Sequence, residues 1–201
     1  MMKLHGFPMS PNTRRALVAL EEHGVPYELV PVDLMSAEHK GAAYLALNPT
    51  GRVPTLVDGD LILWESNAIL EYLAAAHPAT GLGGTSPREI GEIARWMFMN
   101  AAHLSPNVAR IFAHTIRLPP DKRLPQLVDE GRVEVDKSLR ALEGRLAGRT
   151  WLVDHMSNAE LSIAPTLVNA PMLQIDLSKF PAVQAWMGRI TERPSWKKIY
   201  V

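Results

Sequence analysis

A β-hairpin signal at residues 55–63 restricts the fold of this chain more than any other feature. The segment reads Thr-Leu-Val-Asp-Gly-Asp-Leu-Ile-Leu, so two apolar runs flank Asp58-Gly59. Asp-Gly accepts the positive φ angles of a tight turn, which makes it the strongest short-range hairpin signal. The two runs are therefore predicted to be neighbouring antiparallel strands.

The segments before the hairpin predict two strands joined by a helix. Residues 3–7 and 27–32 have the composition of short strands, and between them a helix begins at Ser10-Pro11 and ends at Gly24. Serine as N-cap, proline at the first helical position and glycine after the last turn all agree with these limits. A helix between two strands implies that the strands are parallel.

Two more helices complete the first part of the chain. A short helix is predicted at residues 42–47, and a longer one is capped by Ser66 and continues through Ala76. The order is therefore βαβ, helix, ββα, with one parallel pair and one antiparallel hairpin. This is the element order of a thioredoxin fold.

The composition changes after the third of these helices. Residues 78–87 contain two prolines and three glycines, which predicts a linker. Beyond it, apolar side chains recur at helical spacing, as in residues 89–103 and 124–146. We therefore predict a thioredoxin-like α/β domain at residues 1–77 and an all-α domain at residues 88–201.

The overall composition excludes several classes of protein. Lysine plus arginine and aspartate plus glutamate both number 21, so the basic surplus of a nucleic-acid binder is absent, and the pairs Arg14-Arg15 and Lys197-Lys198 are interpreted as solvated helix faces. No apolar run approaches the roughly 18 residues of a membrane span, and residues 1–6 lack a signal-peptide pattern, so a cytoplasmic protein without a membrane partner is expected. The chain has no cysteine, so any thiol chemistry must use a thiol carried by a ligand.

The start of the first predicted helix is a candidate anion site. A helix N-terminus at Ser10 offers unpaired N–H groups and a partial positive charge. Lowering the pKa of a ligand thiol by about two units takes about 2.7 kcal/mol. A hydroxyl donor and a helix end can supply about 1–2 kcal/mol each. The alternative is that Ser10 only caps the helix, and no His/Asp partner stands at a spacing that would make it a nucleophile.

Three further segments suit the backbone and the ends of a peptide-like ligand. A cis bond within Val53-Pro54 would turn the valine backbone towards such a ligand. The alternative is that this proline only marks the start of the strand and has no role in binding. Glu65-Ser66 suits the charged groups of an α-amino acid end, or is an exposed acid beside a cap. His39-Lys40 suits a terminal carboxylate, or is plain surface. A thioredoxin order places all these loops along one edge of the sheet.

These motifs resemble the cytosolic glutathione transferases, in particular bacterial members similar to the serine-type phi and theta classes. Residues 10–17 resemble the serine motif of the family, and residues 48–56 match its pattern Asn-Pro-x-Gly-x-Val-Pro-x-Leu. Residues 58–69 resemble Asp-Gly-x-x-Leu-x-Glu-Ser-x-Ala-Ile, with a departure at Trp64. Residues 157–160 resemble the capping box of the core helix of the family, with glutamate in place of the usual aspartate. The resemblance covers nearly the whole chain.

The resemblance implies a fold and a set of site residues. The fold is a thioredoxin-like glutathione-binding domain followed by an all-α helical bundle that shapes the second-substrate pocket. Ser10 is implied to stabilise the thiolate, and Asn12 shares or replaces this role in some bacterial and fungal members. The residues implied to bind glutathione are His39, Lys40, Arg52, Val53, a cis Pro54, Glu65 and Ser66.

The implied activity is that of a glutathione S-transferase, which ionises the thiol of glutathione for attack on a small hydrophobic electrophile and so transfers an alkyl or aryl group. Glutathione is then the co-substrate, no metal is needed, and a cytoplasmic homodimer active in detoxification is expected. Met9, His103 and Asn107 are candidates for the electrophile pocket, or are core or surface residues. The alternatives left open are a glutathione-dependent lyase, dehalogenase or peroxidase, and a non-catalytic glutathione-binding protein.

Overall fold

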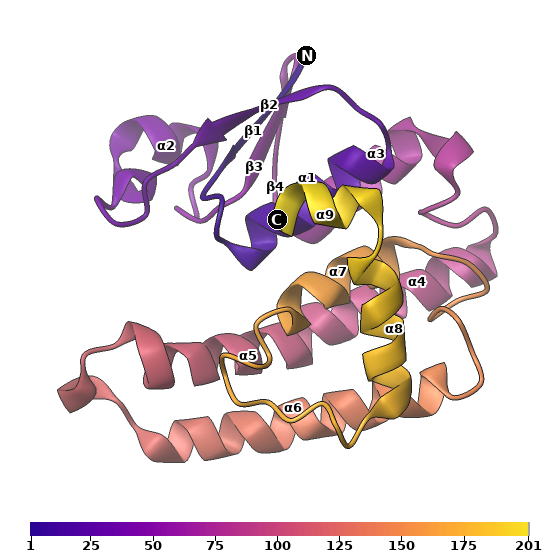
Figure 1. The fold of residues 1–201 in the computed structure, drawn as a ribbon. Helices are drawn as coiled ribbons and strands as arrows, with labels where there is room; N and C mark the ends of the chain where they lie inside the picture. Colours follow the sequence, from indigo (N-terminus) through magenta and orange to yellow (C-terminus); the bar gives the residue numbers. More distant parts are fainter. Residues whose placement is uncertain (201) are drawn as a thin grey trace. The chain divides into compact units, whose positions relative to one another are not determined.

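The computed structural model describes residues 1–200, which form two compact units (Figure 1). The first unit comprises Met1–Gly83 together with the described residues from Pro194 onward, and the second comprises Gly84–Arg193. Among residues 1–200, no helix combines the length and the apolar character that crossing a membrane requires.

A four-stranded mixed sheet forms the centre of the first unit. Its strands are β1 (Met2–Gly6), β2 (Tyr27–Pro31), β3 (Thr55–Asp58) and β4 (Leu61–Trp64), in the order β2-β1-β3-β4. β1 pairs in parallel with β2, and β3 runs antiparallel to both β1 and β4. The hairpin and the parallel pair predicted from the sequence are therefore confirmed, and the fold is thioredoxin-like.

Apolar helix faces pack around this sheet. The helices of the first unit are α1 (Pro11–Glu22), α2 (Ala42–Leu47), α3 (Ser66–Ala76) and α9 (Pro194–Tyr200), with short 3-10 turns at Glu38–Lys40 and Pro78–Thr80. α1 and α3 contact each other, and α1 also contacts α9. Leu20 of α1, Leu70 of α3 and Leu56 of β3 are fully buried, which makes them part of one core.

The last helix differs from the predicted division of the chain. The sequence placed residues 194–201 at the end of the helical domain, whereas α9 packs on α1 and belongs to the first unit. Trp196 supplies the apolar anchor, because its side chain is only 3% exposed. Ser195 donates a hydrogen bond to Glu22, and Lys198 forms an ion pair with Glu21 at 2.8 Å.

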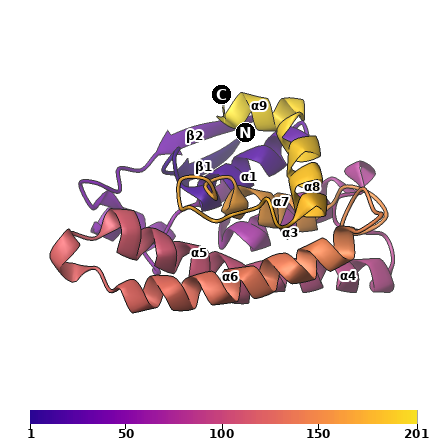
Figure 2. The same cartoon turned by 60° about the horizontal axis from the view of Figure 1, so that its bottom comes forward.

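The described part of the second unit is built from helices. Its α-helices are α4 (Pro87–Met99), α5 (Ser105–Phe112), α6 (Pro125–Leu146), α7 (Asn158–Leu167) and α8 (Pro181–Thr191). Five-residue π-helical segments follow α4 and α5, at Asn100–Leu104 and Ala113–Arg117. α5 and α6 lie side by side (Figure 2). This arrangement confirms the predicted all-α class of this part.

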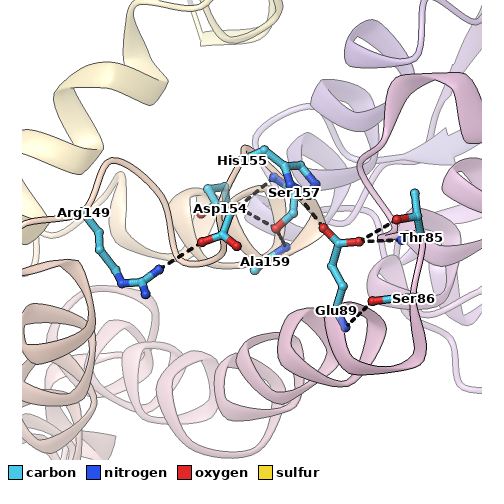
Figure 3. A network of polar contacts seen from close by, with 9 residues as sticks. Thr85, Ser86, Glu89, Arg149, Asp154, His155, Ser157 and Ala159 are labelled. Carbon is cyan, nitrogen blue, oxygen red and sulfur yellow. Dashed lines mark hydrogen bonds and ion pairs between the residues drawn. The ribbon is translucent and has the colours of Figure 1, made fainter.

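Helix α7 is the core of the second unit, since all ten of its residues are buried. Its start carries the predicted capping box, in which Ser157 and Glu160 bond reciprocally to each other's backbone. Figure 3 shows the start of α4 beside this region. There Glu89 accepts a 2.6 Å bond from the Thr85 N–H and lies 3.3 Å from Nδ1 of His155. Polar contacts therefore connect the beginnings of α4 and α7.

Candidate functional site

The register of the sheet places the predicted ligand loops at one edge. Gly6 ends β1 opposite Pro31 of β2, so the loops that follow these two strands begin together. Thr55 begins β3 opposite His5 of β1 and opposite Trp64, the last residue of β4. The loops that contain Ser10, Val53-Pro54 and Glu65 therefore meet at this edge, as the thioredoxin order predicts.

Ser10 is the N-cap of α1, as predicted. Its backbone is extended, with φ −69° and ψ 127°, and its Oγ accepts a long 3.5 Å hydrogen bond from the N–H of Thr13. Its side chain is half-buried, and its hydroxyl hydrogen has no acceptor among residues 1–200. The preceding corner requires glycine at position 6, since a Cβ there would lie 2.5 Å from Cγ2 of Thr13. Ser10 therefore offers a donor beside a positive helix end.

Arg15 connects the two halves of the predicted site. Its Nη1 donates to Oδ1 of Asn12 and to Oγ of Ser66, each at 2.7 Å. The side chain is only 3% exposed, and burial lowers the pKa of Arg15 to about 10, which still leaves it charged at neutral pH. The prediction that Arg14-Arg15 forms a solvated face is therefore wrong for Arg15. Its partner Ser66 lies 51 residues away, so no local pattern reveals this contact.

The start of α3 differs from the expected N-cap. Ser66 is the first residue of the helix, and Glu65 occupies the N-cap position without a side-chain cap bond. Glu65 has a φ of 71°, which costs a non-glycine residue about 1–3 kcal/mol and is typical of binding sites. Ser66 instead accepts a 2.7 Å hydrogen bond from Nη1 of Arg15, a contact that does not use its own hydroxyl hydrogen. Glu65 is exposed beside it.

The Val53–Pro54 peptide bond is cis, as the resemblance implied. Two side chains, Tyr44 and Asn48, fix the residues on both sides of it. Tyr44 and Asn48 donate to the carbonyl of Arg52 at 2.7 and 2.8 Å. Asn48 also donates to Oγ1 of Thr55 at 3.2 Å. The buried pair Tyr44 and Asn48 was missed as support for this loop, although Asn48 stands inside the recognised motif.

The predicted cationic residues form a second group. Lys40 donates from Nζ to the carbonyl of Gly51 at 2.9 Å, which ties the 3-10 turn at Glu38–Lys40 to the segment before Pro54. His39 is half-buried, and its Nδ1 has no hydrogen-bond partner among the described residues. Arg52 is exposed and has no ion-pair partner within residues 1–200. All three are thus compatible with an anionic ligand group.

The residues suggested for the electrophile pocket have different surroundings. Met9 is 60% exposed, and its Sδ accepts a 3.1 Å contact from Nη2 of Arg14. His103 is exposed within the second unit. Asn107 is buried, and its amide donates to the carbonyl of His103 at 2.6 Å, which gives it a structural role.

Comparisons with known proteins match both parts of the chain. A family model described as the glutathione S-transferase N-terminal domain matches residues 1–75, and one for the C-terminal domain matches residues 105–194. Glutathione S-transferase 4 of Zea mays is 35% identical over 98% of this chain and 91% of its own length. Glutathione S-transferase GstB of Escherichia coli strain K12 is 34% identical over 99% of this chain and 97% of its own length.

Solved structures show the same fold. Glutathione transferase F7 from Populus trichocarpa has a TM-score of 0.88 and 32% identity, covering 99% of this chain and 97% of that one. The theta-class glutathione S-transferase from Xanthomonas axonopodis pv. citri, solved with glutathione bound, has a TM-score of 0.91 and 30% identity, covering 100% of this chain and 97% of that one. The fold, both domain matches and the full-length relatives show that this chain belongs to the glutathione S-transferase family of enzymes.

Proposed function

We propose that this enzyme binds glutathione along the sheet edge defined above and ionises its thiol at the start of α1. The thiolate then attacks a small hydrophobic electrophile, forming a carbon–sulfur bond as the leaving group departs. The observation that carries this proposal is Ser10, whose hydroxyl hydrogen is unengaged at the positive end of a twelve-residue helix.

The energetics of thiol activation suit this arrangement. A glutathione thiol with a pKa near about 8.5 is only a few per cent ionised at neutral pH. Lowering the pKa by about two units takes about 2.7 kcal/mol. A hydroxyl bond to an anion contributes about 1.5–3 kcal/mol and a helix end about 0.3–2 kcal/mol, so Ser10 and α1 together reach the required amount.

The rest of the edge supplies complementary charges for the tripeptide. Glu65 would pair with the α-amino group of the γ-glutamyl end, and Ser66 would donate to its carboxylate. The cis bond at Pro54 supports pairing of the Val53 backbone with the cysteinyl unit. His39, Lys40 and Arg52 would bind the glycyl carboxylate. Structural neighbours solved with glutathione or oxidised glutathione support the choice of ligand.

Asn12 is proposed to act chiefly through Arg15. Its Oδ1 accepts the 2.7 Å bond from that guanidinium, while its amide hydrogens stay available to the sulfur. Loss of Asn12 would also remove one of the contacts that hold Arg15 beside Ser66. We therefore expect Asn12 variants to affect glutathione affinity, and Ser10 variants to affect the ionisation of the thiol.

The test is an ultraviolet titration of bound glutathione, combined with turnover of a chloronitrobenzene-type substrate. Ser10→Ala is expected to raise the pKa of the bound thiol by about one unit, the equivalent of about 1.4 kcal/mol. Asn12→Ala should raise KM for glutathione with a smaller change in that pKa. Ser86→Ala is the matched control, because Ser86 caps α4 in the second unit by accepting from the Glu89 N–H at 3.2 Å. An unshifted thiol pKa in the wild type would refute the proposal.

A panel of electrophiles separates the remaining alternatives. Glutathione binding without turnover of any substrate class would favour a non-catalytic carrier, and cleavage of an ether, a halide or a peroxide would favour the corresponding glutathione-dependent activity. The homodimer, the cytoplasmic location and the role in detoxification stay predictions from the resemblance. Gel filtration with light scattering tests the first of these.

A further inference from the structure

We propose that Tyr200, the last residue of α9, is a positioning residue for the glutathione site, acting through Arg14 on the loop that ends in Ser10. The proposal rests on the function proposed above. It concerns contacts within the first unit alone, where α9 lies against α1 (Figure 1).

Arg14 joins α9 to the loop between β1 and α1. Its Cζ lies 4.5 Å from the centre of the Tyr200 ring, within the range of a cation–π contact. Its Nε donates to the carbonyl of Pro8 at 3.0 Å, and its Nη2 reaches Sδ of Met9 at 3.1 Å. One guanidinium therefore holds both residues that precede Ser10.

The Tyr200 ring is itself held in place. It stacks on Trp196 with ring centres 4.2 Å apart and planes 9° apart. Trp196 is buried against the first unit and anchors the same helix there, whereas the exposed Lys198 adds only a surface ion pair with Glu21. The ring is thus a fixed platform, and Arg14 is ordered between it and the loop.

The ring face of Tyr200 makes this contact. The hydroxyl is buried and has no hydrogen-bond partner among residues 1–200. Burial raises the pKa of Tyr200, so the phenol stays neutral at physiological pH. A phenylalanine ring would therefore provide the same platform, whereas alanine would leave Arg14 without it.

The geometry has a direct consequence for thiol activation. A sulfur at the start of α1 interacts with a hydroxyl whose position depends on the Pro8–Met9 backbone. Releasing Arg14 frees that backbone, and a misplaced donor stabilises the thiolate less well. Tyr200→Ala is accordingly expected to raise KM for glutathione about 5-fold to 10-fold and to raise the pKa of the bound thiol, the effect of losing a contact of cation–π strength.

The experiment compares five variants by thiol titration and steady-state kinetics. Tyr200→Ala and Arg14→Ala should show the same shift, and the double variant should be no worse than either single one, because both break one connection. Tyr200→Phe should recover most of the loss. Lys198→Ala, on the same helix, removes only the ion pair with Glu21 and should leave the thiol pKa at the wild-type value.

Three results would overturn the positioning role of Tyr200, and they are distinguishable from one another. If Ser10→Ala shifts the thiol pKa but Tyr200→Ala does not, the positioning role is overturned while the proposed function stands. If Tyr200→Ala speeds hydrogen exchange in the segment before α1 without moving the thiol pKa or KM, Tyr200 is merely structural and the proposal also fails. An unshifted thiol in the wild-type enzyme overturns the proposed function and, with it, this inference.

Discussion

Replacing Glu160 by alanine is expected to destabilise the second unit strongly, because this carboxylate is the polar centre of a buried helix start. The side chain is fully buried, and its Oε1 accepts from the N–H of Leu152 at 2.7 Å. Its Oε2 accepts from the N–H and the hydroxyl of Ser157 at 2.8 and 2.7 Å. Burial raises the pKa of Glu160, and these hydrogen bonds oppose that shift.

The magnitude follows from the groups left without partners. Glu160→Ala strands two backbone N–H groups in the core, each at a cost of about 1–3 kcal/mol, and also removes a cap worth about 1 kcal/mol. We expect a loss of about 3–5 kcal/mol in the free energy of unfolding. For a chain of 201 residues this lowers Tm by roughly 8–16 °C, at about 2–4 °C per kcal/mol.

Urea unfolding followed by tryptophan fluorescence and circular dichroism measures this loss. Glu160→Gln keeps one acceptor oxygen and is expected to lose about half as much stability. Glu134→Ala is the control, since Glu134 lies on α6 in a surface pair with Lys137 and should cost under about 0.5 kcal/mol. A Glu160→Ala protein that unfolds within about 1 kcal/mol of wild type would refute the reasoning.

Three further predictions concern stability. Burial, with the neighbouring His77, lowers the pKa of His23 from 6.5 to about 4. Between these pH values the unfolded chain binds the proton more strongly than the folded chain, so the free energy of unfolding should fall as the pH drops. Because the imidazole is only half-buried, the loss should be about 1–2 kcal/mol, and urea titrations at pH 7.5 and 4.5 should show it in wild type but not in His23→Gln. Gly131→Ala should cost about 1–3 kcal/mol, since its Cβ would lie 3.0 Å from Cγ1 of Ile111, and an unchanged urea midpoint would contradict the packing. Gly144→Ala, with no atom within 4 Å of the new Cβ, should instead stabilise α6 by about 0.5–1 kcal/mol in the same assay.

Local sequence signals were sufficient to predict most of the helices and strands of the first unit. The helices predicted at residues 42–47 and 66–76 have the bounds of α2 and α3, because Gly41 and Pro49 flank the first and Pro78 follows the second. The Asp58-Gly59 turn joins β3 and β4 as predicted. The end of α4 and the whole of α5 were harder to predict from the sequence, since a π-helical segment joins the two helices without a break in helical composition.

Single sequence motifs predicted individual residues of the site, but they did not predict the contacts between residues that are distant in the sequence. Ser10 is the N-cap of α1, as its neighbours in the sequence suggest. Ser66 was wrongly predicted as a cap, because neither the positive φ of Glu65 nor the contact with the distant guanidinium of Arg15 can be recognised from the neighbouring sequence. Arg15 was wrongly predicted to be solvated, although it stands four residues before buried Ala19 on the inner face of α1; helical periodicity was a signal that could have placed it inside.

The position of α9 has a consequence for biosynthesis. A nascent chain emerges N-terminus first, and its early domains begin to fold before the later ones exist. In this protein Trp196, which covers part of the first unit, is translated only after the second unit, Gly84–Arg193. A product terminated at Arg193 would leave an apolar stretch of α1 bare, so this unit reaches its native state only after the whole second unit has been translated.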